Sequence, residues 1–204
     1  MKKLVVASGN PGKLAEIRAL LAPLGIEVVS QGDLGIAEAE EPHFSFLENA
    51  LAKARHASKA SGLPALADDS GICVDALGGE PGVNSAYFAG TQGVREARDA
   101  RNNAKLLDAM APATIKTAHY ACVMVLVRHA GDPQPLVAEG NWRGEITDRP
   151  RGSSGFGYDP LFLIPALGQT AAELDPVTKN RISHRGIALQ RIVEALRERL
   201  RDAP

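Results

Sequence analysis

Several short segments of this 204-residue chain bring together residue types that could bind a charged compound or act on it. The first segment runs from Ser8 to Lys13 (Ser-Gly-Asn-Pro-Gly-Lys), between an apolar stretch and a helical pattern. Glycines let backbone N–H groups approach an anion, a helix N-terminus adds partial positive charge, and Lys13 adds a full charge. The segment favours phosphate binding. Its spacing is not that of a Walker A loop, and a tight turn with a surface lysine is the alternative.

A pair of acidic residues, Asp68 and Asp69, directly follows the apolar residues 63–67 and precedes Ser70 and Gly71. Mg²⁺ prefers one or two carboxylates together with substrate phosphates, and a carboxylate in such a site can deprotonate water. Because successive strand residues point to opposite faces, only one of the two carboxylates can easily face a ligand. The alternative is a simple turn stabilised by the aspartate side chains.

Aromatic residues are scarce in this chain, yet Phe156, Tyr158 and Phe162 lie within seven residues. Phe156 and Tyr158 follow a stretch rich in glycine and serine, which favours a platform on which a ring can stack. Stacking of a base on an aromatic side chain is worth about 1–3 kcal/mol. Phe162 belongs to an apolar run, so a position in the core is consistent with its surroundings.

Basic residues gather near the C-terminal end, where Lys179 is followed by Ser183, His184 and Arg185. Ser183 could cap a last helix, which would put His184 and Arg185 at its N-terminus. Cations at that end oppose the helix macrodipole, and an anionic or carbonyl-bearing ligand would compensate for this. A solvated basic surface is the alternative.

Alternating apolar patterns predict the elements that must position these residues. We expect strands at residues 4–7, 26–29, 63–67, 72–74, 117–127 and 136–146. We expect helices from Pro11 to before Gly25, from about Phe44 to near Gly62, within 92–110, and after Ser183. Helices and strands alternate in the first half and long strands adjoin in the second. This order predicts an α/β fold with a central mixed β-sheet flanked by helices, with two lobes around a cleft.

Composition limits the classes of function. The formal net charge is −1, which argues against general nucleic-acid or membrane-surface binding, because both depend on massed lysine and arginine. No apolar run approaches the roughly 20 residues that a membrane helix needs. The two cysteines, Cys73 and Cys122, lie apart in apolar surroundings, which fits free thiols in a reducing compartment. We therefore expect a cytoplasmic protein.

Taken in order, the segments form a set that covers nearly the whole chain. The set resembles the inosine triphosphate pyrophosphatase family, also known as the Ham1 or RdgB type. The segments that carry the resemblance are Ser8–Lys13, Phe46-x-x-Asn49-Ala50 with Lys53-Ala54, Ala67–Gly71, Gly78–Gly82, Phe156–Pro160, Thr170–Leu174 and Ser183–Gly186. The resemblance implies one elongated domain over residues 1–204 and a homodimer. It also implies Mg²⁺-dependent hydrolysis of ITP, dITP and XTP to the monophosphate and pyrophosphate.

The resemblance also assigns roles to residues. Asp69 is implied as general base and metal ligand, and Glu41 as the second metal ligand. Because Glu40 stands beside it, which of the two glutamates matches the family's metal ligand is left open. The implied substrate contacts are Ser8, Gly9, Asn10, Pro11, Gly12, Lys13, Lys53, Ser70, Phe156, Gly157, Tyr158, Asp159, Lys179, His184 and Arg185.

Two other functions use similar features. A regulatory protein could bind a nucleotide without turnover, although an intact Asp69 beside a phosphate loop argues against this. A dinucleotide-dependent oxidoreductase would need a G-x-G-x-x-G segment after its first strand and an acidic residue at the end of the second, and this chain has neither.

Overall fold

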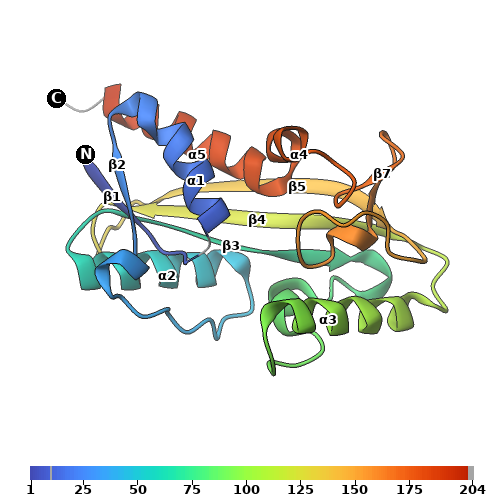
Figure 1. Ribbon diagram of the computed structural model, residues 1–204. Coiled ribbons are helices and arrows are strands. Elements are labelled where there is room, and N and C mark those ends of the chain that lie inside the picture. Colours follow the sequence, from blue (N-terminus) through green and yellow to red (C-terminus); the bar gives the residue numbers. More distant parts are fainter. Residues whose placement is uncertain (10, 202–204) are drawn as a thin grey trace. The chain divides into compact units, whose positions relative to one another are not determined.

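Strands and helices alternate along the first half of the chain, and two long strands follow one another in the second half (Figure 1). The computed structural model describes residues 1–9 and 11–201. Its strands are β1 (Lys3–Val6), β2 (Glu27–Ser30), β3 (Ala65–Val74), β4 (Thr117–Val127), β5 (Leu136–Ile146), β6 (Phe162–Ile164) and β7 (Gln169–Thr170). Its α-helices are α1 (Pro11–Leu21), α2 (Phe46–Ser61), α3 (Arg95–Met110), α4 (Pro176–Ile182) and α5 (His184–Arg201).

Seven strands of the described residues form one open sheet in the order β2-β1-β3-β4-β5-β6-β7. Strand β1 is parallel to β2 and β3, whereas β6 is antiparallel to β5 and β7. The sheet is therefore mixed, and the expected α/β class is confirmed. The two long strands β4 and β5 are neighbours in the sheet and have the bounds that their sequence pattern predicts.

The chain divides into two compact units, which are described separately below. Unit 1 comprises Met1–Asp69, Cys122–Gly140 and Ile187–Pro204, and unit 2 comprises Ser70–Ala121 and Asn141–Gly186. Strands β3, β4 and β5 and helix α5 each have residues in both units. The boundary within β3 falls between Asp69 and Ser70, two of the expected site residues.

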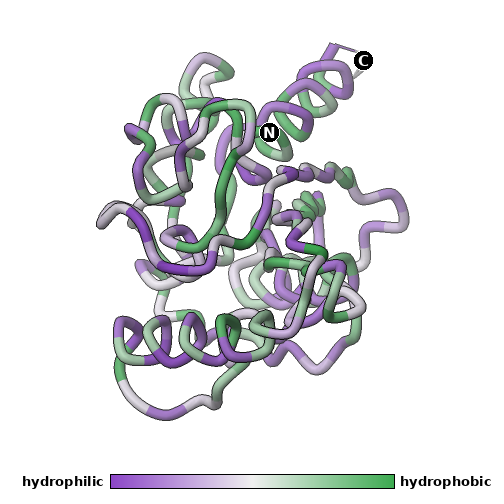
Figure 2. Tube along the Cα trace, turned by 90° about the vertical axis from the view of Figure 1, so that its right-hand side faces the viewer, coloured by the Kyte–Doolittle hydropathy of each residue, from purple (hydrophilic) through white to green (hydrophobic). Residues whose placement is uncertain are grey.

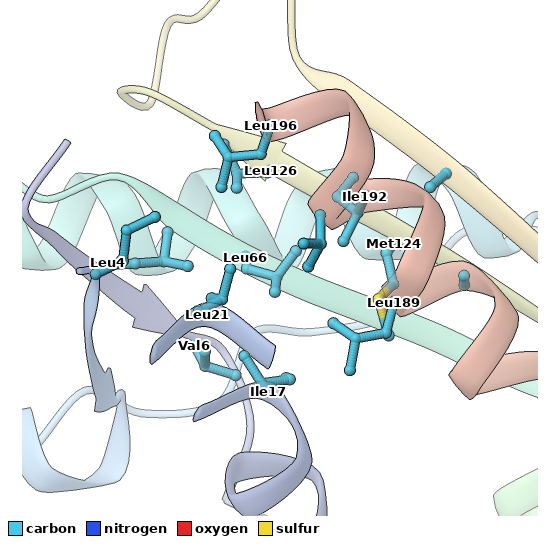
Figure 3. Packing of buried hydrophobic residues seen from close by; sticks show 14 of the residues in the cluster. Leu4, Val6, Ile17, Leu21, Leu66, Met124, Leu126, Leu189, Ile192 and Leu196 are labelled. Atoms are coloured by element: carbon cyan, nitrogen blue, oxygen red, sulfur yellow. The ribbon is translucent and has the colours of Figure 1, made fainter. Parts of the chain in front are cut away.

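Alternating side chains of the strands in unit 1 build two apolar layers. Leu4 and Val6 of β1 pack into one cluster with α1 and α5, whereas Val5 packs into another with α2. Figure 1 shows α1 and α5 on one face of these strands and α2 on the other. Figure 3 labels the core of the first cluster: Leu4, Val6, Ile17, Leu21, Leu66, Met124, Leu126, Leu189, Ile192 and Leu196. Each such buried side chain contributes about 1.5–3 kcal/mol by leaving water.

The core of unit 2 is richer in aromatic residues. Tyr120, Trp142 and Phe162 contact one another there, and the face-to-edge pair of Tyr120 and Phe162 has ring centroids 4.7 Å apart. Helix α3 contributes Leu106 and Met110 to this core, and its other faces are largely exposed.

Glycine and serine set several helix ends as expected. Gly25 and Gly62 adopt left-handed conformations (φ 64° and 70°) immediately after the helical segments that they end. The Ser183 hydroxyl accepts a hydrogen bond from the Gly186 amide at the start of α5, as a capping residue does. The apolar residues spaced along α5 predict one buried stripe. Leu189, Ile192, Val193 and Leu196 are buried, whereas Leu200 is exposed.

Figure 2 shows hydrophilic and hydrophobic residues alternating along the helix that ends at the label C, which is α5. The alternation fits a helix with one buried face. None of the helices within residues 1–9 and 11–201 is both long and apolar enough to span a bilayer.

One expectation about β3 is wrong. The sequence predicts separate strands at residues 63–67 and 72–74, with Asp68–Gly71 between them, but β3 is continuous from Ala65 to Val74. The two aspartates fit inside a strand because lysines distant in the sequence pair with them.

The connection between β4 and β5 is held by a buried carboxylate. Asp132 has no exposed side-chain surface and accepts hydrogen bonds from the backbone amides of Arg128 and Gln134, each at 2.9 Å. The guanidinium of Arg128 bonds to both of its oxygens. The hydrogen bonds from the Arg128 side chain hold the pKa of Asp132 well below its usual range.

Replacing Asp132 with asparagine should lower stability in a pH-dependent way. The folded-state pKa lies below the unfolded value of about 3.9, so the carboxylate stabilises the fold above about pH 4 and this contribution is lost as pH falls. We expect Asp132→Asn to lower the midpoint of thermal unfolding by about 2–6 °C at pH 7, and by less at pH 3. Asp148→Asn, at an exposed carboxylate, is the control. A deficit that stays the same at both pH values would contradict this role for the charge.

Candidate functional site

In unit 1, the expected phosphate-binding lysine is paired with one of the two strand aspartates. The Lys13 Nζ lies 2.8 and 2.7 Å from the two carboxylate oxygens of Asp68. The Asp68 side chain is 5% exposed and that of Lys13 is 19% exposed. Lys13 lies in the first turn of α1 and Asp68 lies in β3, so the pair joins two elements that are distant in the sequence.

The neighbouring aspartate faces different partners, as the alternation of a strand requires. One oxygen of Asp69 lies 2.9 Å from the Nζ of Lys53, and the same Nζ lies 3.0 Å from Glu41. The other oxygen accepts a hydrogen bond of 3.3 Å from the side-chain amide of Asn49. Lys53 and Asn49 are one turn apart on α2, so one helix face supplies both donors.

Asn49 also fixes the loop that carries Glu41. Its side chain accepts from the backbone amide of His43 and donates to the His43 carbonyl. Asn49 is almost completely buried. It therefore ties Asp69 to the loop two residues beyond Glu41.

The surroundings of Asp69 make it an unusually basic carboxylate. Burial raises the pKa of Asp69 to about 6, against the lowering effect of Lys53, and Glu41 raises it further. Burial lowers the pKa of Lys53, but Asp69 and Glu41 together outweigh that effect and raise it. Lys53 is therefore a stable cation between two carboxylates.

This donor set suits a divalent cation. Glu41 and Asp69 already share one positive group, and carboxylate oxygens are the ligands that Mg²⁺ prefers. Within the part of the chain that the structure describes, no three His, Cys, Asp or Glu side chains converge on one point. A metal held here would have two protein carboxylates and would take its other ligands from substrate and water. Glu41, rather than Glu40, is the residue whose carboxylate contacts Lys53.

In unit 2, one exposed aromatic ring is surrounded by cations. Phe156 is 42% exposed. The guanidinium of Arg95 lies 4.4 Å from its ring centroid, the Nζ of Lys179 5.3 Å, and the guanidinium of Arg185 5.9 Å. Such contacts stabilise a cation over a ring by about 0.5–1 kcal/mol at exposed sites.

A buried carboxylate organises the loop that carries this ring. Asp159 is 3% exposed; it accepts a hydrogen bond of 2.8 Å from the Phe156 amide and forms an ion pair with Lys179. Glycine is favoured at position 155, because its φ is +81° and a Cβ there would lie 2.2 Å from an oxygen of Asp159. Asp159 thus sets the position of both Lys179 and the backbone of Phe156.

His184 and Arg185 form the first turn of α5, as expected. The His184 ring is buried and stacks on Tyr120, with centroids 4.7 Å apart and planes 9° apart. An Nη2 of Arg185 lies 3.2 Å from the Ser70 hydroxyl. A Cβ at Gly186 would lie 1.8 Å from the carbonyl oxygen of Asn180, so glycine there permits the close approach of α4 and α5.

The expected site residues therefore fall into two groups. In unit 1, Lys13, Glu41, Lys53 and Asp69 belong to the ion pairs described above, with Ser8 buried and Gly9 and Gly12 exposed. In unit 2, Ser70, Phe156, Gly157, Asp159, Lys179 and Arg185 are joined by hydrogen bonds or ring contacts within that unit. Asn10 and the side chain of Pro11 lie outside the described residues.

Tyr158 does not fit the stacking role that the sequence suggests for it. Tyr158 is 3% exposed within the core of unit 2, and its hydroxyl donates a hydrogen bond of 2.9 Å to the carbonyl of Ser85. Phe162 is completely buried in the same core. Of these three aromatic residues, Phe156 alone has an exposed ring.

Sequence reasoning missed several residues that contact the expected ones. Asn49 was part of a recognised segment but had no role. Arg95, Asp99 and Asn103 of α3 all contact the Phe156–Gly157 segment. Their spacing of four residues was the available signal, because such residues share one face of a helix.

Residues 4–195 match the model of the Ham1 family. The chain belongs to the Ham1 family. This confirms the resemblance found in the sequence. A protein of Ralstonia nicotianae named dITP/XTP pyrophosphatase is 63% identical over 97% of this chain and 98% of its own length. A protein of Nitrosomonas europaea with the same name is 62% identical over 97% of this chain and 96% of its own length.

Solved structures of the Ham1 family share the fold. A HAM1 protein from Coxiella burnetii has a TM-score of 0.91 and 46% sequence identity, covering 97% of this chain and 100% of that chain. The Ham1 protein of Staphylococcus aureus has a TM-score of 0.88 and 35% identity, again over 97% of this chain and 100% of that chain.

Proposed function

We propose that this protein hydrolyses purine nucleoside triphosphates with non-standard bases, ITP, dITP and XTP, to the monophosphate and pyrophosphate. Such a reaction would remove these nucleotides from the pool used for nucleic-acid synthesis. The observation that carries the proposal is the buried carboxylate of Asp69, which is held by Lys53 and Asn49 and whose pKa burial raises to about 6. Asp69 shares Lys53 with Glu41, and the next residue, Ser70, contacts the arginine beside an exposed aromatic ring. Relatives named dITP/XTP pyrophosphatase support it.

The lysines and Phe156 account for binding. Lys13 and Lys53, which form ion pairs with aspartates, can bind phosphate oxygens instead. The N-terminus of α1 adds backbone N–H donors. The exposed ring of Phe156 offers a face for the base. Arg185 offers donors to an oxygen on the base, since a guanidinium only donates.

Asp69 is the residue that we assign to proton removal. It takes a proton from water as the water oxygen bonds to the α-phosphorus, and the bond from that phosphorus to the bridging oxygen of the β-phosphate breaks. Pyrophosphate leaves with that bond's electron pair. Asn49 and Lys53 hold the carboxylate of Asp69 in place for this step.

Mg²⁺ is the metal that we assign to Glu41 and Asp69, where it would neutralise charge on the phosphates and the leaving pyrophosphate. The two carboxylates supply the oxygen ligands that this ion prefers. We further propose that residues 1–204 act as one enzymatic domain, in a homodimer, in the cytoplasm, where nucleoside triphosphates are used.

The products of ITP identify the reaction. We expect inosine monophosphate and pyrophosphate in equal amounts, dependence on a divalent cation, and no inosine diphosphate at any time. In water enriched with oxygen-18, the label should enter the monophosphate and not the pyrophosphate, because the water attacks the α-phosphorus. Mass spectrometry of both products measures this directly.

Other outcomes would point to other functions. Label in orthophosphate, or transient inosine diphosphate, would show stepwise removal of the γ-phosphate. Tight binding of ITP without any turnover would favour a regulatory nucleotide-binding protein. Chelation of divalent cations with no loss of rate would contradict the role of Glu41 and Asp69 as metal ligands.

A further inference from the structure

We propose that Asp99 and Asn103 of α3 are positioning residues that hold the Phe156 ring ready to stack on the purine base. This inference rests on the proposed function. It assigns a role to a helix whose sequence indicates only a charged surface element.

The two side chains bind the two backbone polar groups of Gly157, the residue that follows Phe156. The carboxylate of Asp99 accepts a hydrogen bond of 2.9 Å from the Gly157 amide. The side-chain amide of Asn103 donates a hydrogen bond of 2.9 Å to the Gly157 carbonyl. Both backbone groups of Gly157 are therefore held by α3, directly after Phe156.

Side chains hold the backbone amides of Phe156 and Gly157, whereas the Phe156 carbonyl accepts a hydrogen bond from the Asp159 amide. Residues 152–158 lie between β5 and the short helical turn at 159–161, outside any strand. The Phe156 amide is held by Asp159 and the Gly157 amide by Asp99. Together these contacts restrain the backbone on both sides of the Phe156 ring, which otherwise has an exposed side chain.

A third residue shows that this face of α3 is directed at the ring. Arg95, Asp99 and Asn103 are spaced four residues apart and so lie on one helix face. The guanidinium of Arg95 lies 4.4 Å from the Phe156 ring centroid. Toward the C-terminal end of α3, Leu106 and Met110 are buried in the core of unit 2 and anchor that end of the helix.

A ring that must stack on a base loses less freedom on binding when its backbone is already fixed. The clamp formed by Asp99 and Asn103 should therefore act through Phe156. Its effect on substrate binding should vanish when the Phe156 ring is absent. Stacking contributes to binding, so the effect should fall mainly on KM. A residue needed only for folding would instead act equally with or without the ring.

A double-mutant cycle tests this. We expect Phe156→Ala to lower kcat/KM for ITP about 10- to 100-fold, and Asn103→Ala to lower it about fivefold, mainly through KM. In the Phe156→Ala background, adding Asn103→Ala should change kcat/KM less than twofold. Losses that multiply in the double variant would overturn the proposal.

Conservative and control variants separate positioning from folding. Asp99→Asn keeps an acceptor oxygen and should retain most of the activity, whereas Asp99→Ala should match Asn103→Ala. Asp108→Asn makes the same change as Asp99→Asn at an exposed position of α3, and it should have no effect on kcat/KM. Equal losses for Asp99→Asn and Asp99→Ala would also count against the clamp.

The proposed function and the clamp can fail separately. The affinity of each variant for inosine monophosphate, measured by titration calorimetry, reports on the clamp without turnover. If the protein binds inosine monophosphate but does not cleave ITP, the proposed reaction is wrong. The double-mutant cycle can then still be evaluated from the affinities of the variants for inosine monophosphate. A protein that neither binds inosine monophosphate nor cleaves ITP would overturn both.

Discussion

Replacing Asp69 with asparagine is expected to lower kcat for ITP by a factor of about 10²–10⁴, the usual contribution of a general base. Asparagine cannot accept the proton from water, although it keeps the size of the side chain. The variant should remain folded. Burial raises the pKa of Asp69, so its surroundings disfavour the charge that the substitution removes. The midpoint of thermal unfolding should therefore stay the same or rise.

Asp68→Asn is the matched comparison, because it makes the same chemical change one residue earlier. Asp68 accepts two hydrogen bonds from Lys13 and is 5% exposed, so its loss should lower the thermal midpoint. Its effect on kcat should be smaller than that of Asp69→Asn, since it faces a different partner. Asp68→Asn should thus have the lower thermal midpoint, and Asp69→Asn the lower kcat. A larger loss of kcat in Asp68→Asn would reverse the assignment of roles.

Selectivity for ITP over ATP is the second large effect, and we expect kcat/KM to differ by about 10⁴. Hypoxanthine and xanthine carry an oxygen acceptor at position 6 and an N–H at position 1, whereas adenine has the reverse pattern. Arg185 lies 5.9 Å from the centroid of Phe156, so a base on that ring would lie close to a group that only donates. Facing the amino group of adenine, such a donor would be left without an acceptor.

Kinetic constants for both nucleotides measure this ratio. Arg185→Met should narrow it, mainly by lowering kcat/KM for ITP, because the donor for the oxygen is lost. Arg191→Met is the matched control, since Arg191 lies further along α5 and bonds to the carbonyl of Glu139. Equal kcat/KM for ITP and ATP in the unaltered protein would contradict recognition by the base edge.

Much of the fold could be predicted because local patterns and tertiary contacts agree. Strands β4 and β5 have the bounds that their apolar residues predict, and Gly62 ends α2 as a left-handed glycine does. The interior of β3 could not be predicted. Two adjacent aspartates favour a turn locally, and their stabilising partners are 16 and 55 residues away in the sequence.

The site could be predicted as residue types more readily than as contacts. Phe156 and Tyr158 look alike in the sequence, but a hydrogen bond to the Ser85 carbonyl and the aromatic core bury Tyr158. Asp99 and Asn103 carry no motif, and their importance depends on which face of α3 meets the loop. Pairing of this kind is tertiary information that periodicity does not contain.

Three lysines among the expected substrate contacts are each held by a carboxylate. The pairs are Lys13 with Asp68, Lys53 with Asp69, and Lys179 with Asp159. A small anion that draws one lysine away would leave a nearly buried aspartate without its cation, which is costly. A ligand that carries several anionic groups is better able to offset that loss than one that carries a single group. Orthophosphate and other simple anions should therefore compete weakly with a triphosphate, even where they are far more abundant.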